Sequence, residues 1–216
     1  MDWFGTIDAY CERVDAGFWS EPVNAVSNLA FLVGAALAYR EWRRRGGHDG
    51  ASLFLIALVA VIGTGSFLFH TFANGWSLIA DVLPIAVFIY GFFGLALYRF
   101  LRLHAVATMA GTILFAALAQ GVERLAEPLL GSSASYLPAL LALGGIGAWL
   151  ASRGSGAGRL LLLAAGVFAV SLTLRTLDGP LCAAWPLGTH FLWHILNAAT
   201  LTLCLLAAIR FPRMKA

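Results

Sequence analysis

Residues 51–80, ASLFLIALVAVIGTGSFLFHTFANGWSLIA, contain no aspartate, glutamate, lysine or arginine. The tripeptide Asn74-Gly75-Trp76 offers a turn near the end of this stretch, after more than twenty residues that are mostly apolar and carry no Asp, Glu, Lys or Arg. A helix needs roughly 20 predominantly apolar residues to cross about 30 Å of hydrocarbon. The stretch therefore predicts one membrane-spanning helix over 51–72 and the beginning of the next.

The composition of the whole chain agrees with a membrane protein. Of its 216 residues, 60% are hydrophobic and only 12% are charged, whereas a soluble domain has about 25% charged residues. This excludes the soluble globular, disordered and coiled-coil classes. The net charge of +3 does not indicate a nucleic-acid partner, because the basic residues stand in short clusters between apolar segments.

Charged residues divide the chain into seven apolar segments, which predicts an all-α membrane protein with one seven-helix domain over 1–216. An N-terminal segment, 1–21, precedes the first helix. The first fifteen residues are acidic and lack the pattern of a signal peptide. The predicted spans are 23–40, 51–72, 79–98, 103–122, 135–151, 159–175 and 186–209.

The basic residues orient this bundle. Only Arg13, Arg124 and Arg175 fall on the side of the N-terminus. Eleven others fall on the opposite side: Arg40, Arg43, Arg44, Arg45, Arg99, Arg102, Arg153, Arg159, Arg210, Arg213 and Lys215. Lysine and arginine concentrate in cytoplasmic loops, so we expect an outer N-terminus and a cytoplasmic C-terminus. A bacterial inner membrane, with the N-terminal side in the periplasm, suits this pattern, and an endoplasmic-reticulum membrane with a lumenal N-terminal side satisfies the same charge rule.

Four ionisable groups are predicted at one membrane depth, near the outer surface. His70 ends the second span, Asp81 begins the third, and His190 and His194 begin the seventh. Such groups are costly inside a membrane and usually mark a functional site. The simpler interpretation is that each histidine forms a hydrogen bond between helices.

The histidine spacing favours a metal. His190 and His194 are four residues apart and project from one helix face. Three imidazoles with an open fourth position are typical of catalytic zinc, which lowers the pKa of a bound water to about 7. Phe191 stands where a zincin motif would have its glutamate. Asp81 is the only carboxylate at the same depth, so we expect it to act as the base.

The N-terminal segment is rich in oxygen ligands, including Asp8, Glu12, Asp15 and Glu21. Calcium binds six to eight such oxygens, but a solvated acidic tail explains the composition equally well. Cys11 and Cys182 both fall on the predicted outer side, where disulfides persist.

Taken together, these residues resemble the alkaline ceramidase family of seven-span membrane hydrolases and, more distantly, adiponectin-receptor-type proteins. The resemblance covers the chain from end to end. The matching pieces are Asp8…Cys11-Glu12, Glu21-Pro-Val-Asn24-Ala-Val-Ser27-Asn28, Ser66-x-x-x-His70, Asp81, Asp178-x-x-x-Cys182 and His190-x-x-x-His194.

The resemblance implies a role for each of these residues. His70, His190 and His194 would hold zinc, Ser66 would stabilise an oxyanion, and Asp81 would handle the proton of the attacking water. Cys11 and Cys182 would form a disulfide. Calcium would bind Asp8, Glu12, Glu21 and the carbonyl of Tyr10. Val14 stands where the family has a side-chain ligand, and Asp15 could compensate for it.

The predicted function is zinc-dependent hydrolysis of the N-acyl amide of a membrane lipid such as ceramide, giving a fatty acid and a long-chain amine. The alternative is a seven-span lipid receptor with a structural zinc site. Substrate headgroup, acyl-chain length and oligomeric state cannot be read from the sequence.

Overall fold

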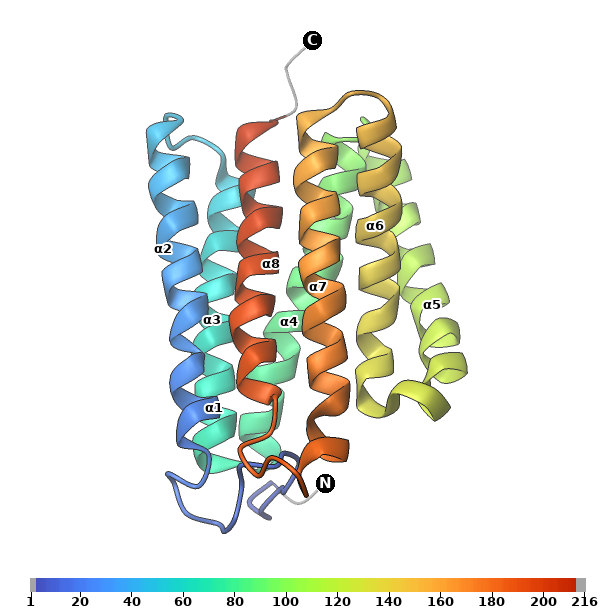
Figure 1. Cartoon of the computed structure of the whole chain (residues 1–216). Helices are drawn as coiled ribbons and strands as arrows, with labels where there is room; N and C mark the ends of the chain where they lie inside the picture. The colour runs from blue at the N-terminus through green and yellow to red at the C-terminus, as the bar shows by residue number, and fades with distance from the viewer. Residues whose placement is uncertain (1–2, 213–216) are drawn as a thin grey trace.

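The computed structural model describes residues 3–212, and every regular element in that range is helical (Figure 1). Arg213 and Lys215, which were counted in the charge asymmetry, lie outside the described residues. The elements are α1 (Pro22–Ser27), α2 (Leu29–Arg44), α3 (Gly50–Phe72), α4 (Gly75–Arg99), α5 (Ala105–Leu130), the 3-10 helix η1 (Gly131–Tyr136), α6 (Leu137–Ser152), α7 (Gly156–Leu181) and α8 (His190–Arg210).

Six helical stretches of the described chain are long and apolar enough to cross a membrane. One of them, Ala105–Ser152, comprises α5, η1 and α6 in succession. Figure 1 shows α5 and α6 running alongside each other, with η1 at the turn between them. Apolar side chains such as Ile113, Leu114 and Leu118 on α5 are more than half exposed. A soluble surface rarely exposes apolar residues in such contiguous numbers, so this face suits lipid.

The helix α8 is the most buried of these stretches and packs between α2 and α7 (Figure 1). The main apolar core fills the space around it. Its largest fully buried side chains include Phe31 on α2, Ile62 on α3, Leu161 on α7 and Leu205 on α8. Residues at the start of α8 are therefore surrounded by protein on several sides.

A close contact between α3 and α4 positions two of the predicted site residues. A Cβ on Gly65 would overlap the carbonyl oxygen of Ala80, so only glycine permits this approach of the two backbones. Pro84 has no N–H to donate to that same carbonyl within α4. Because Gly65 and Ala80 are each followed by a site residue, the contact brings Ser66 next to Asp81.

Several helices extend beyond the spans predicted from charge. The prediction ended one span at 122, but α5 continues through Glu123, Arg124 and Glu127 to Leu130. Likewise, α7 continues past 175 to Leu181. Charged side chains mark where a helix leaves the hydrocarbon of the membrane, but they do not interrupt its backbone hydrogen bonds. Residues 23–40 are also not one helix, because the chain breaks at Asn28 between α1 and α2.

The end of the bundle at which α8 ends is held by a partly buried ion pair. Both terminal nitrogens of Arg99 donate to Asp49, at 2.8 and 3.0 Å, and one also donates to the carbonyl oxygen of Ala208. Asp49 in turn accepts from the backbone N–H of Ser52 at the beginning of α3. The pair therefore joins α3, α4 and α8.

Replacement of Asp49 by asparagine should lower the free energy of unfolding by about 1–3 kcal/mol. Burial opposes ionisation of this carboxyl, but hydrogen bonds from Arg99 and Ser52 outweigh it and hold the pKa of Asp49 below its ordinary value. Its stabilising effect is complete above the unfolded pKa of about 4 and is lost as the pH falls through the folded pKa. Melting temperatures of wild type and Asp49→Asn should thus converge in acid, and a constant difference would contradict this account.

Candidate metal centre

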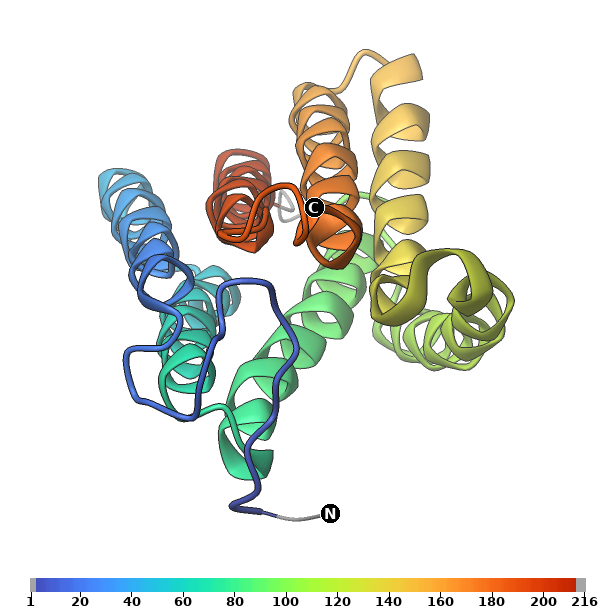
Figure 2. The same ribbon diagram turned by 60° about the horizontal axis from the view of Figure 1, so that its bottom comes forward.

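The N-terminal segment closes the end of the bundle opposite the C-terminus. Figure 2 shows this segment crossing the ends of the helices before it enters α1. The N–H of Ile7 donates to the carbonyl oxygen of Ala73 after α3, and Cys11 forms a disulfide with Cys182 beyond α7. The predicted disulfide is therefore confirmed, and it ties the segment to the chain that leads into α8.

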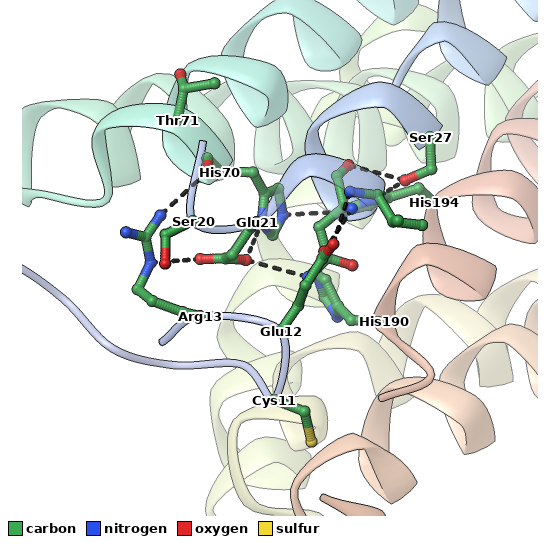
Figure 3. Close-up of polar contacts among 12 residues, drawn as sticks. Cys11, Glu12, Arg13, Ser20, Glu21, Ser27, His70, Thr71, His190 and His194 are labelled. Atoms are coloured by element: carbon green, nitrogen blue, oxygen red, sulfur yellow. Dashed lines mark hydrogen bonds and ion pairs between the residues drawn. The ribbon is translucent and has the colours of Figure 1, made fainter. Parts of the chain in front are cut away.

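The three predicted histidines meet beneath this segment (Figure 3). His70 lies in the last turn of α3, and His190 and His194 lie in the first two turns of α8. All three side chains are at most 2% exposed. Each offers a ring nitrogen, and these atoms lie within 4.8 Å of one another. The Nε2 atoms of His70 and His194 are only 3.1 Å apart.

The partners of the other ring nitrogens determine which nitrogens carry protons. Nδ1 of His70 is 2.6 Å from a carboxylate oxygen of Glu21, so it donates. Nδ1 of His194 is 2.7 Å from the hydroxyl oxygen of Ser27. That hydroxyl already donates to the carbonyl of Asn24, so it accepts from His194. In these neutral tautomers both Nε2 atoms present lone pairs.

Two nitrogen lone pairs that face each other across 3.1 Å repel unless a proton or a metal ion lies between them, and the third ring nitrogen that converges on them, from His190, favours a metal ion. Tetrahedral zinc with Zn–N bonds of 2.0–2.1 Å would place its ligand nitrogens about 3.3 Å apart. A histidine ligand also typically donates its second N–H to a carboxylate or other oxygen, as His70 and His194 do. The arrangement therefore fits a zinc ion.

His190 completes the group from the face covered by the N-terminal segment. Its Nδ1 is buried without a hydrogen-bond partner among the described residues, which points to an unfilled coordination or hydrogen-bonding role. The ring of Tyr10 stacks on it with centroids 3.6 Å apart. Burial raises the pKa of the Tyr10 hydroxyl above its ordinary value, so the phenol stays neutral.

Asp81 and Ser66 lie together beside the histidines. The Ser66 hydroxyl donates to the Asp81 carboxylate, and His70 lies within electrostatic range of that carboxylate. Both residues are buried, and Oδ1 of Asp81 has no hydrogen-bond partner among the described residues. Asp81 does not belong to the group of ligand atoms within 4.8 Å. Its position suits proton transfer better than coordination.

The structure does not gather the predicted calcium ligands. The two oxygens of Glu12 accept from the N–H groups of Val23 and Asn24 at the beginning of α1, each at 2.7 Å. Asp15 accepts from the N–H of Gly17, and Asp8 is exposed. The carbonyl of Tyr10 accepts from the N–H of Arg13. These residues do not fit a calcium ion in this arrangement.

Glu21 is instead part of a buried network with His70. One oxygen contacts Nε of Arg13 at 2.5 Å, and the other accepts from His70 and Asn24. Its side chain is 1% exposed. Burial opposes ionisation, but the hydrogen bonds from His70 and Asn24 and the charge of Arg13 together hold the pKa of Glu21 below its ordinary value.

Asp178 is a further residue whose role only the structure reveals. Oδ1 accepts from the N–H groups of Thr189 and His190 at 2.7 and 2.9 Å, and Oδ2 accepts from the N–H of Cys11 at 3.1 Å. Gly188, with φ of +68°, lies so close to the carboxylate that a Cβ would overlap it. One carboxylate thus holds the beginning of α8, and with it His190, against the N-terminal segment.

Apolar space lies inward of the histidines. A cavity among α3 to α8 reaches Asn197, one turn beyond His194, and continues along Ile62, Phe88 and Cys204. A groove of about 450 Å³ between α4, α5 and α6 shares several of its lining residues, including Tyr136. The histidines do not line either space.

The sequence matches no model of a known protein family, and no curated protein matches it. The function must therefore be argued from the geometry of the site.

Proposed function

We propose that this protein is a zinc-dependent membrane hydrolase that cleaves the N-acyl amide bond of ceramide or a similar lipid. The observation that carries the proposal is the convergence of three buried histidines whose ring nitrogens lie within 4.8 Å of one another, with the Nε2 atoms of His70 and His194 3.1 Å apart. His190 supplies a third nitrogen to the same group. The resemblance of the motifs to alkaline ceramidases supports the amide as the bond that is cleaved.

Each residue of the site has a role in this reaction. His70, His190 and His194 would hold the metal, and a bound zinc ion would supply Lewis acidity for the activation of water and of the carbonyl. Asp81 accepts a proton from the attacking water and returns it to the leaving amine nitrogen as the C–N bond breaks. Once Asp81 has taken this proton, the Ser66 hydroxyl is free to donate its own hydrogen bond to the oxyanion that forms as the C–O bond is made. The products are a fatty acid and a long-chain amine.

The apolar spaces support a lipid substrate. The groove between α4, α5 and α6 is lined mostly by apolar side chains, and it shares lining residues with the adjoining cavity, which reaches Asn197 one turn beyond His194. An acyl chain fits this lining. The amide would then lie at the depth of His70, near the end of the bundle.

The proposed topology is a seven-span bundle with its histidine end outside the cytoplasm. The described arginines in the loops after α2, α4 and α6 lie at the opposite end, as the positive-inside rule requires of the cytoplasmic side. The Cys11–Cys182 disulfide suits an oxidising compartment. A bacterial inner membrane with a periplasmic site satisfies both observations.

The alternative, a lipid receptor with structural zinc, is less well supported. Structural zinc sites are closed by four protein ligands, whereas catalytic sites keep one position open. Within residues 3–212 the histidine group supplies three ligand atoms, one from each histidine. Asp81 and Ser66, placed beside the group but outside it, have no role in the receptor hypothesis.

Purified protein should contain one zinc ion per chain by elemental analysis and should release fatty acid from labelled ceramide or another lipid in a panel of N-acyl amines. Each substrate should be tested with and without a zinc chelator, because loss of activity on chelation links the two properties. Folded, zinc-loaded protein that releases fatty acid from none of them would overturn the hydrolase proposal. Folded protein without metal affinity would overturn the zinc site itself.

A further inference from the structure

Arg13 is a buried cation at the point where the N-terminal segment meets the metal centre. Its side chain is 2% exposed, and Nε contacts Glu21. One terminal nitrogen donates to the carbonyl of Asp15 and the other to the carbonyl of His70, each at 3.1 Å. The guanidinium therefore contacts one carboxylate and one carbonyl oxygen of the N-terminal segment and one carbonyl oxygen at the end of α3. Figure 3 shows Arg13 between Glu21 and His70.

The contact with His70 satisfies an acceptor at the end of α3. The last carbonyls of a helix have no intrahelical partner. The N–H of Asn74, four residues after His70, donates to Ser77 instead. An arginine side chain can supply the missing donor and also interacts favourably with the negative end of the helix dipole. Arg13 thus fixes the backbone of His70 directly.

A second contact fixes the imidazole of the same residue. Arg13 neutralises Glu21, and Glu21 accepts from Nδ1 of His70. This bond selects the tautomer whose Nε2 faces His194. Without Arg13, Glu21 would be a buried carboxylate with no full positive charge beside it, which is strongly unfavourable.

Carboxylate and carbonyl oxygens are also what calcium binds, and Glu21 was among the residues predicted to bind it. Here three such oxygens surround a guanidinium. The side chains of Glu12 and Asp15 and the carbonyl of Tyr10 are engaged elsewhere, and Asp8 is exposed. We infer that the guanidinium of Arg13, and not a divalent cation, is the positive charge that holds the N-terminal segment on the bundle and positions His70 for the metal. This inference rests on the proposed zinc site.

The test uses the full-length protein and compares Arg13→Gln with a matched control, Arg99→Gln. Arg99 is likewise buried, pairs with a carboxylate and donates to a helix carbonyl, but at the opposite end of the bundle. Loss of a partner that orients a metal ligand typically weakens metal affinity 10- to 100-fold. Zinc affinity, measured by competition with a chelator, should fall by about that factor in Arg13→Gln and stay unchanged in Arg99→Gln, although both variants should melt earlier.

Cobalt provides a spectroscopic readout that a purely structural role would not change. The visible spectrum of the cobalt-loaded site should shift in Arg13→Gln and match wild type in Arg99→Gln. Arg13→Lys keeps the positive charge but cannot donate to three acceptors in the same geometry, so its zinc affinity should be intermediate. This variant takes the place of Arg13→Gln if Arg13→Gln does not fold. Wild-type affinity and spectrum in either Arg13 variant would overturn the positioning role.

Calcium titration tests the other half of the inference. Millimolar calcium, compared with a calcium chelator, should change neither the melting temperature nor the zinc affinity of the wild-type protein. A calcium-dependent rise in either would show that a divalent cation is bound after all. If wild type binds neither zinc nor cobalt, the proposed function fails, whereas the calcium titration still decides which cation holds the segment.

Discussion

Replacing His194 by alanine is expected to abolish zinc binding. The substitution removes one of the two facing Nε2 atoms and leaves two imidazoles, fewer than the three protein ligands of a catalytic zinc site. Affinity should fall by more than the roughly 10- to 100-fold that loss of an orienting partner costs. Elemental analysis of the purified variant should find far less than one zinc per chain, and fatty-acid release should be lost with the metal.

His48 provides the matched control for this experiment, because it is an exposed histidine after α2 at the far end of the bundle. His48→Ala should retain both zinc and activity. His194→Ala also removes the bond to Ser27, so its folding should be verified by circular dichroism. A folded His194→Ala protein with full zinc content would disprove the metal centre.

Asp81→Asn is expected to lower the rate of hydrolysis by about 10²- to 10⁴-fold, the usual contribution of a general acid–base group. Asparagine has nearly the same shape and can still accept from Ser66, but it cannot carry a proton from water to the leaving amine. Because Asp81 lies outside the histidine group, zinc content should not change. Rates should be measured at saturating lipid, with zinc determined on the same samples.

Asp49→Asn is the control for Asp81→Asn, since it makes the same chemical change in an ion pair at the other end of the bundle. It should lower stability but leave turnover per zinc unchanged. Full activity in Asp81→Asn would remove the proposed base. The receptor hypothesis would be favoured by a different outcome. In that outcome wild type shows no turnover, and zinc-loaded Asp81→Asn protein binds lipid as well as wild type does.

Much of the fold could be predicted from hydropathy. The 51–72 span corresponds to α3, and the turn at Asn74-Gly75 lies between α3 and α4. Helix ends were predicted less well, because α5 and α7 continue through charged residues that a membrane disfavours but a helix tolerates. Charge marks the boundary of the hydrocarbon, and backbone hydrogen bonds mark the boundary of the helix.

The sequence by itself determined the class of protein and the depth of its ionisable groups. A run of apolar residues has to be helical in lipid, and alternating helix directions put His70, Asp81, His190 and His194 at one end. Only the tertiary structure decided that Glu21 accepts hydrogen bonds from His70 and Arg13, and that Asp178 holds the beginning of α8. Contacts of an irregular segment depend on the path of the chain in space, and no periodic pattern in the sequence encodes that path.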